Sequence, residues 1–275
     1  METRPEGNGA RLKIGIFDSG LGGLALAKAI QDRLPDYDYL YLGDTKRVPY
    51  GNRSQETIHE YVSEALDFLF ARDCQLIILA CNTASAEALR KSQQEYLPKH
   101  FPNRRVLGVI IPTVESALDD GEGRAIGVLA TQSTIDSQAF TREVHRSSPP
   151  TQVIGIAAPL LVPIVENDGF KYASPIISDY IAPLINAAVG SILLGCTHYC
   201  LLKNQIRDLT SIRVISQDEV VPDKLADYLF RHPEIDAKLS KNGGREYYLT
   251  DFTPAYERFV SRLTGENLSF QKVVL

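Results

Sequence analysis

Short apolar runs recur along the chain and alternate with longer segments in which apolar residues return every three or four positions. The short runs, bounded by turn residues, are typical of buried strands, and the longer period is typical of helices that cover a sheet. This alternation predicts βα units around parallel sheets, an α/β protein. We expect strands at Lys13–Phe17, Tyr37–Leu42, Gln75–Ala80, Arg105–Ile110, Ala125–Ala130, Gln152–Ala157 and Ser191–Leu194, and a clear amphipathic helix at Ser54–Arg72.

Length and charge narrow the classes of protein that the chain can represent. Its 275 residues, 44% of them hydrophobic, exceed the usual size of a single domain and favour two domains. The net charge is −5 and the Lys and Arg residues are scattered, which argues against a nucleic-acid partner. The N-terminal stretch has no apolar leader region, and no run of about 18 apolar residues occurs. We therefore expect a cytoplasmic protein that is not inserted in a membrane.

Two of the four cysteines follow buried strands in similar contexts. The segments LIILACNT (76–83) and SILLGCTH (191–198) each contain a buried strand, a small residue, a cysteine and polar residues. A lone cysteine in a reducing compartment is most often a small buried hydrophobe. Ligands of open α/β sheets, however, bind beyond the carboxyl ends of the strands, where Cys81 and Cys196 stand. The free amides of a following helix can hold a carboxylate there and lower the pKa of a thiol.

The other two cysteines are interpreted differently. Cys74 is expected at a helix end just before a strand, on the side opposite to the ligand, as a core residue. Cys196, His198 and Cys200 could form a fragment of a zinc site, but the second close pair that such sites use is missing. We therefore expect no metal, and we place Cys200 in the first turn of the following helix, near the site but outside it.

Two polar loops are further candidates for binding. In IGIFDSGLGG (14–23), Asp18 and Ser19 occupy the turn after the first strand, and the glycines allow a ligand to approach the backbone closely. Asp18 places negative charge where a dinucleotide pyrophosphate would lie, so an ammonium group suits this loop better. In GDTKRVPYGNRS (43–54), a Pro-Tyr-Gly turn could present a hydroxyl and a backbone amide, although the same residue types are typical of a plain surface turn.

A pair of facing thiols suits one type of reaction. Inverting an α-carbon requires one group that removes a proton from one face and another that delivers a proton to the opposite face. Thiol and thiolate forms of cysteine are both accessible near neutral pH, because the ordinary pKa of a cysteine is about 8.5. Cys81 and Cys196 can therefore serve as acid and base, with their roles exchanged when the reaction runs backwards.

These motifs carry a resemblance to a known family. The blocks FDSGLGGL, YLGDTKRVPYGNRS, ACNTASA, LLVPIVE and LGCTHY occur in this order, and with them the chain resembles the glutamate racemases of bacterial cell-wall synthesis from about Lys13 to about Val260. The resemblance implies that Cys81 acts on D-glutamate and Cys196 on L-glutamate. It implies that Asp18 and the Glu166–His198 pair support the thiols. The substrate contacts that it implies come from Asp18, Ser19, Tyr50, Gly51, Asn82, Thr83, Thr197 and His198.

The resemblance also implies an architecture and a role. The family has two pseudo-symmetric α/β domains with the active site between them, which here assigns residues 1–105 and 220–275 to the first domain and 106–219 to the second. No pyridoxal phosphate or other cofactor is implied, and the D-glutamate product would supply the peptidoglycan stem peptide. Members of the family often dimerise.

The chain departs from the family pattern at three places. Cys200 stands where proline usually follows Gly-Cys-Thr-His-Tyr, Pro112-Thr113 replaces Pro-Gly, and Ser216-Gln217 replaces Asp-Ser. An aspartate racemase would share the fold and the mechanism. The aspartate racemase family, however, carries Glu at the position of His198, so the chain resembles it less. An amino-acid binding protein would share the carboxylate donors without using the thiols, and a thiol hydrolase would need a base beside a single nucleophile.

Overall fold

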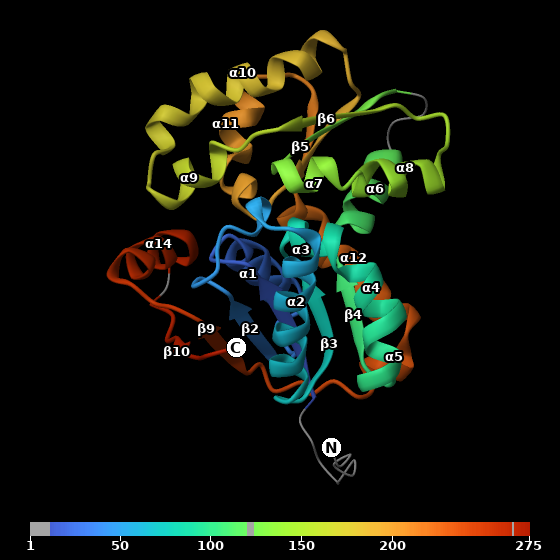
Figure 1. The fold of residues 1–275 in the computed structure, drawn as a ribbon, viewed down its shortest axis with the longest axis vertical. Helices are drawn as coiled ribbons and strands as arrows, with labels where there is room; N and C mark the ends of the chain where they lie inside the picture. Colours follow the sequence, from blue (N-terminus) through green and yellow to red (C-terminus); the bar gives the residue numbers. More distant parts are fainter. Residues whose placement is uncertain (1–11, 120–123, 266) are drawn as a thin grey trace.

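The computed structural model describes residues 12–119, 124–265 and 267–275. The first eleven residues, from which no leader was expected, lie outside this range. The chain forms two α/β lobes, each around one sheet, stacked along the long axis of the molecule (Figure 1). One sheet has the strand order β10-β9-β2-β1-β3-β4 and the other the order β6-β5-β7-β8. The strands are β1 (Lys13–Asp18), β2 (Tyr39–Gly43), β3 (Cys74–Leu79), β4 (Arg105–Gly108), β5 (Ile126–Ala130), β6 (Val153–Ala157), β7 (Ser191–Gly195), β8 (Arg213–Ile215), β9 (Arg245–Leu249) and β10 (Gln271–Lys272).

The two sheets repeat one topology. Each of the strand pairs is parallel. The order β2-β1-β3-β4 in one sheet corresponds to β6-β5-β7-β8 in the other, so that β1 matches β5 and β3 matches β7. In each sheet the chain passes from the first strand (β1 or β5) to a neighbour on one side (β2 or β6). It then returns to form the neighbour on the other side of the first strand (β3 or β7). The carboxyl ends of the first and third strands therefore flank the point at which ligands bind.

Helices cover both faces of each sheet, which explains why the strands are apolar throughout. Along β1, Ile14 and Ile16 face the core beneath α1 and α12, whereas Phe17 faces the core beneath α2. The helices are α1 (Gly23–Arg33), α2 (Gln55–Phe70), α3 (Asn82–Glu87), α4 (Leu89–Lys91), α5 (Leu97–His100), α6 (Ile110–Asp119), α7 (Gln132–Asp136), α8 (Ala139–Ser147), α9 (Leu161–Glu166), α10 (Ala173–Asn186), α11 (Lys203–Asp208), α12 (Gln217–Arg231), α13 (Pro233–Asp236) and α14 (Pro254–Thr264).

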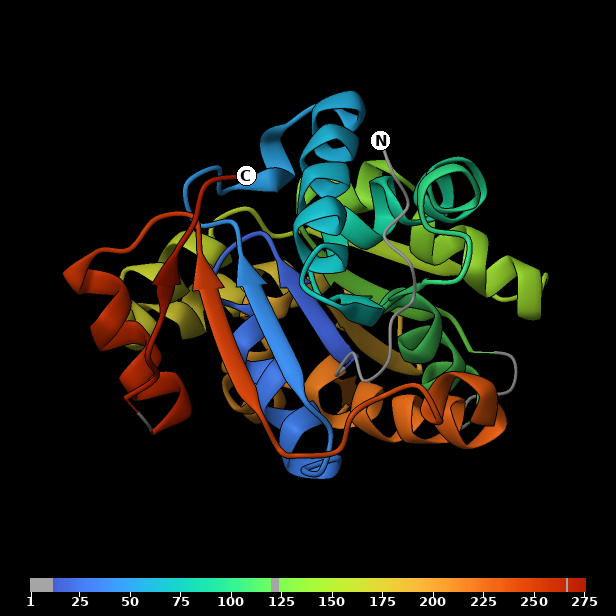
Figure 2. The same ribbon diagram turned by 90° about the horizontal axis from the view of Figure 1, so that it is seen from below.

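The chain crosses between the lobes near two of its helices. β4 pairs with β3 in the six-stranded sheet, and α12 follows β8 of the four-stranded sheet but packs on α1 of the other lobe. In the view from below, α12 and α13 run beside the sheet that contains β1, β2 and β9 (Figure 2). The expected boundary at 105/106 lies inside β4 and the one at 219/220 lies inside α12. We therefore propose crossings after Gly108 and after Ile215.

The secondary structure agrees with the predicted pattern and extends it. All seven expected strands are present, and the expected helix at Ser54–Arg72 is α2, whose first turn is capped by the Ser54 hydroxyl accepting from the Thr57 N–H at 3.3 Å. Three strands were not expected, β8, β9 and β10. Cys74 was placed wrongly, because it is the first residue of β3 rather than the end of a helix.

The segment after Cys196 also differs from the expectation of an ordinary helix start. Residues Thr197–Leu202 form a 3-10 helix, which contains Cys200, and α11 begins only at Lys203. Position 200 is a cysteine, so the chain lacks a proline that would favour the first turn of an α-helix here. Among the described residues, no helix is both long enough and apolar enough to cross a bilayer.

Candidate active site

Four strand ends meet where the two sheets face each other. In the six-stranded sheet, β1 ends at Asp18, and β3 is followed by Cys81. At the equivalent places of the other sheet, β5 is followed by Thr131, and β7 by Cys196. The Thr197 hydroxyl donates to Asp18 Oδ1 at 3.3 Å, which joins the two edges directly. The repeated topology therefore places the two cysteines at equivalent strand ends on opposite sides of one site.

Cys81 lies at the first-lobe side of this site. It caps the N-terminus of α3, and the Ser19 hydroxyl donates to its Sγ at 3.2 Å. Burial, together with the negative charge of the neighbouring Asp18, raises the pKa of the Cys81 thiol to about 12, although the bonds from Ser19 and the Ala84 amide act in the opposite direction. The Cys81 side chain is therefore a thiol at neutral pH.

Asp18 is the buried carboxylate beside Cys81. It is fully buried, and its Oδ2 accepts from the Gly20 N–H at 3.0 Å. Burial raises the pKa of Asp18, while the nearby His198 and the hydrogen bonds to this carboxyl partly offset that effect. A cation brought next to Asp18 would stabilise its charged form.

Cys196 lies on the opposite side, against a histidine that has a carboxylate partner. His198 Nδ1 is 3.9 Å from Cys196 Sγ, and His198 Nε2 is 3.1 Å from Glu166 Oε1. Burial by itself would lower the pKa of His198, but the interactions with Cys196 and Glu166 outweigh burial and raise this pKa to about 10. The ring is therefore an imidazolium at neutral pH, held between a sulfur and a carboxylate. The Glu166–His198 pair that the resemblance implied is present as a contact.

Gly22 allows this histidine to approach the first lobe. A Cβ atom at position 22 would lie 2.6 Å from His198 Nδ1 and 2.8 Å from Thr197 Oγ1. Contacts this short do not occur for real side chains, so only glycine fits here without displacing the ring. The glycines after Asp18 were expected to allow the close approach of a ligand, and Gly22 allows the close approach of the other lobe.

The loop that contains Tyr50 and Gly51 lies beside the site. Tyr50 is buried in the short 3-10 helix Tyr50–Asn52, and its hydroxyl donates to Asp44 Oδ2 at 2.6 Å. Gly51 lies against Thr131 of the other lobe, so that a Cβ atom at position 51 would be 3.2 Å from the Thr131 Cβ. The loop is thus packed into the seam between the lobes rather than being a plain surface turn.

Thr83 contacts two threonines of the second lobe, and Asn82 contacts the first residue of α12; sequence reasoning placed none of these partners in the site. The Thr83 hydroxyl is 3.1 Å from that of Thr131 and 3.4 Å from that of Thr134. Asn82 forms two hydrogen bonds with Gln217. The sequence did carry a signal for Thr131, because this residue directly follows a buried strand, as Cys196 does. The only sequence signal at Gln217 was that Ser216-Gln217 departs from the family pattern described above.

The remaining cysteines do not take part in these contacts. Cys74 and Cys200 are buried, and all four cysteines are free. Burial, with the charge of Asp218, raises the pKa of Cys200 to about 12, against the bond from Ser216. Within the described ranges, no three His, Cys, Asp or Glu side chains gather in a way that could hold a metal ion.

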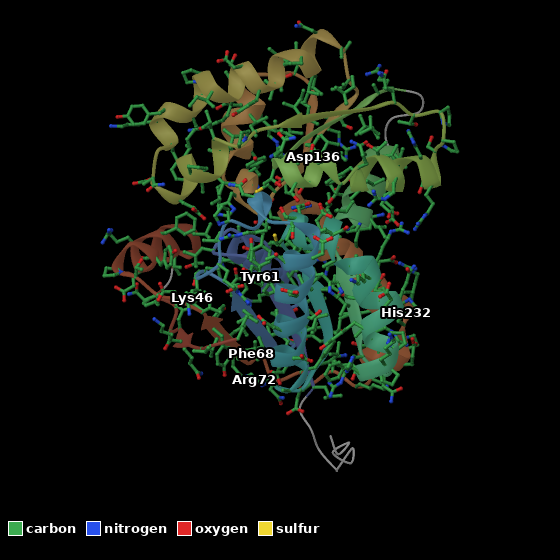
Figure 3. All side chains as sticks on the ribbon, viewed as in Figure 1. Lys46, Tyr61, Phe68, Arg72, Asp136 and His232 are labelled. Atoms are coloured by element: carbon green, nitrogen blue, oxygen red, sulfur yellow. The ribbon has the colours of Figure 1, made fainter. Side chains whose placement is uncertain are left out.

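The exposure of the side chains differs between parts of the site. Cys81 and Cys196 are each only 6% exposed, whereas the side chain of Glu166 is 34% exposed. A cavity of about 510 Å³ opens beside Glu166 and is lined in part by Phe170, Phe259 and Leu263. In Figure 3, Asp136 of α7 is labelled above the seam and Tyr61 of α2 below it, with side chains filling the region between the lobes.

The comparisons with known proteins agree with this geometry. The family description Asp/Glu/Hydantoin racemase matches residues 24–220. A glutamate racemase of Aquifex aeolicus is 39% identical over 260 residues, which cover 94% of this chain and 96% of that protein.

The chain belongs to the glutamate racemase family. Solved structures of this family superpose closely on it. A glutamate racemase isoform from Bacillus anthracis matches with a TM-score of 0.87 and 31% identity over 97% of this chain and 99% of that one. The glutamate racemase from Francisella tularensis, solved in complex with D-glutamate, matches with a TM-score of 0.85 and 28% identity over 96% and 98% of the two chains. The expected two-lobed α/β fold of the glutamate racemases is thereby confirmed.

Proposed function

We propose that the protein interconverts L- and D-glutamate without a cofactor, with Cys81 and Cys196 as the two proton carriers. One observation carries this proposal: two buried cysteines follow equivalent strands of two matching sheets, and each has its own polar support on its own side of one site. The substrate is inferred from the relatives, which are named glutamate racemases.

The protonation of the two sides fits a reaction that starts from L-glutamate. Cys81 holds its proton, because its pKa is raised to about 12. Cys196 Sγ lies 3.9 Å from Nδ1 of the His198 imidazolium, and we propose that Cys196 reacts as the base. The Cys196 thiolate would take the α-proton of L-glutamate and become a thiol, and the Cys81 thiol would deliver its proton to the opposite face and become a thiolate. D-glutamate would react through the same steps in reverse.

The polar groups around the thiols suit the charges of an amino acid. We propose that the substrate ammonium group lies against Asp18, whose buried carboxylate would gain a cationic partner. Amide and hydroxyl donors would then hold the carboxylates. The proposed substrate contacts are Asp18, Ser19, Tyr50, Gly51, Asn82, Thr83, Thr197 and His198, and the proposed supports of catalysis are Asp18, Glu166 and His198.

Entry of the substrate requires the lobes to separate. Both cysteines are buried, and the hydrogen bonds between Thr197 and Asp18 and between Thr83 and Thr131 join the lobes across the site. We propose that these contacts open and close as glutamate enters and leaves. Solution scattering profiles that are identical for the free and the glutamate-bound protein would contradict this motion.

The cellular role and the assembly of the protein are proposed on the resemblance. We propose that the D-glutamate product supplies peptidoglycan synthesis and that the protein works in the cytoplasm, where a reducing environment would keep both thiols free. We propose further that two copies associate. Sedimentation velocity tests this, and a single species with the mass of one chain would contradict it.

Incubation with glutamate in D₂O tests the reaction. We expect L-glutamate to lose its optical rotation and its α-proton signal without any added cofactor. The variants Cys81→Ser and Cys196→Ser should each stop racemisation. The first should still exchange the α-proton of L-glutamate, and the second that of D-glutamate, because one thiol remains on one face. Cys74→Ser, the same change at a buried cysteine outside the site, is the control and should stay active.

The outcomes separate the alternatives. Racemisation of aspartate but not glutamate would keep the mechanism and change the substrate. Racemisation that survives in either variant would refute the two-thiol mechanism. Glutamate binding without any proton exchange would identify an amino-acid binding protein.

A further inference from the structure

Asn82 and Gln217 form a buried amide pair beside the site. The Asn82 Nδ2 donates to Gln217 Oε1 at 2.8 Å, and the Gln217 Nε2 donates to Asn82 Oδ1 at 2.6 Å. Asn82 is 2% exposed and Gln217 is fully buried. Asn82 directly follows Cys81 at the start of α3, whereas Gln217 begins α12 after β8 of the other sheet. The pair therefore joins the start of α3 to the start of α12, where the chain returns from the second lobe, next to Cys81.

The reciprocal bonds couple the orientations of the two amides. A primary amide has two N–H donors and one oxygen with two lone pairs, and the pair uses one donor and one lone pair of each partner. With Gln217 unmoved, a half-turn of the Asn82 amide would bring oxygen against oxygen and nitrogen against nitrogen, and buried polar groups would lose their partners. Only a half-turn of both amides together restores the two bonds. Gln217 thus prevents the Asn82 amide from turning on its own.

We propose that Gln217 is a positioning residue for substrate binding. It occupies the Asn82 oxygen and leaves the second N–H of Asn82 for a carboxylate of glutamate. A carboxylate accepts hydrogen bonds and is repelled by an amide oxygen, so the orientation of this amide affects the affinity for the substrate. The inference rests on the proposed function, in which Asn82 contacts glutamate.

Gln217→Leu removes the pair without adding charge. We expect the KM for glutamate to rise about tenfold while kcat stays within about threefold, because one charge-assisted hydrogen bond is misdirected. If Gln217 acts through Asn82, the same change should add little to KM in an Asn82→Ala background, so that the double-mutant cycle shows strong coupling. A purely structural role would instead raise KM by the same factor in both backgrounds.

Gln217→Glu adds a dependence on pH. A protonated carboxyl donates and accepts as the amide does, whereas an ionised carboxylate only accepts and cannot satisfy Asn82 Oδ1. The KM of this variant should be close to that of the wild type at low pH and should rise as the new carboxyl ionises. The control is Gln75→Glu, because Gln75 is also buried but its Nε2 donates to the Asn103 carbonyl, at the opposite end of β3. It should show no such rise.

The outcomes distinguish this inference from the function on which it rests. If the wild-type chain does not racemise glutamate, the proposed function fails and the inference fails with it. If the wild type is active but Gln217→Leu leaves KM unchanged, or raises it equally with and without Asn82, the positioning role alone is overturned. Elevated KM with strong coupling, and a KM for Gln217→Glu that rises with pH, would support it.

Discussion

Replacing Glu166 by glutamine tests how the site keeps a proton on His198. Glu166 Oε1 lies 3.1 Å from His198 Nε2, and the side chain of His198 is only 4% exposed. Burial would lower the pKa of His198, but Cys196 and Glu166 together raise it to about 10. Glu166→Gln keeps the size of the side chain and removes its negative charge. The pKa of His198 should therefore fall.

The size of the fall follows from the geometry. Two unit charges about 4 Å apart interact by about 4 kcal/mol at an effective dielectric constant of about 20. Because the Glu166 side chain is 34% exposed, solvent screening reduces this interaction to about 1–2 kcal/mol. That energy corresponds to about one pKa unit. We therefore expect His198 to titrate about one unit lower in the variant, still above its ordinary value because Cys196 remains.

Nuclear magnetic resonance of the histidine rings measures this pKa directly. The chain has five histidines, and His198→Asn identifies the signal of His198. The ring is followed rather than the rate, because the ammonium group of free glutamate also titrates at alkaline pH. The matched control is Glu234→Gln, which removes the carboxylate 3.2 Å from His232 Nδ1. His232 is labelled at the outer edge of the lower lobe, away from the seam (Figure 3). This control should leave the titration of His198 unchanged.

The free energy of unfolding of Glu166→Gln should also be lower than that of the wild type. A histidine whose pKa is raised by folding stabilises the protein fully below its unfolded pKa of 6.5, and the contribution disappears as the pH rises through about 10. Urea unfolding should therefore show Glu166→Gln to be about 1–2 kcal/mol less stable than the wild type at pH 6 and nearly equal to it above pH 10. An unchanged pKa of His198 in Glu166→Gln would refute the reasoning.

Two further predictions concern the close approach of the lobes and the response to acid. Gly22→Ala would place a Cβ 2.6 Å from His198 Nδ1, so kcat/KM should fall about 10- to 100-fold as the ring is displaced. The control is Gly20→Ala, whose new Cβ would lie 3.4 Å from the nearest atom of Val48 and which should keep most of the activity. Equal losses in the two variants would contradict this account. Burial by itself would raise the pKa of Asp38, but hydrogen bonds from Ser240, Asn242 and Gly244 lower this pKa to about 2. The contribution of Asp38 to stability is therefore present above about pH 4 and is lost as the pH falls through 2. Asp38→Ala should cost about 1–2 kcal/mol at pH 7 and less at pH 2, as measured by urea unfolding, and an equal cost at both values would argue against this role of the ionised carboxylate.

The sequence was sufficient to locate the seven principal strands and the two central cysteines. Both signals are local: a strand buried on both faces is a short apolar run, and a residue just beyond its carboxyl end lies on the ligand side of a parallel sheet. The strands that were missed, β8, β9 and β10, have three, five and two residues. β8 and β10 are edge strands, for which a short run carries little pattern, and β9 begins with the polar pair Arg245-Glu246.

Only the tertiary structure decided which polar groups meet across the site. Gln217 bonds with Asn82, 135 positions away in the chain, and Thr197 bonds with Asp18, 179 positions away. No local periodicity records such pairs, because they form only when segments far apart in the chain pack together. The protonation of the site has the same origin, since burial of Cys81 beside Asp18, and of His198 between Cys196 and Glu166, depends on both lobes being in place. Residue identities thus determined which groups are available for proton transfer, and the packing of the lobes determined the charges that they carry.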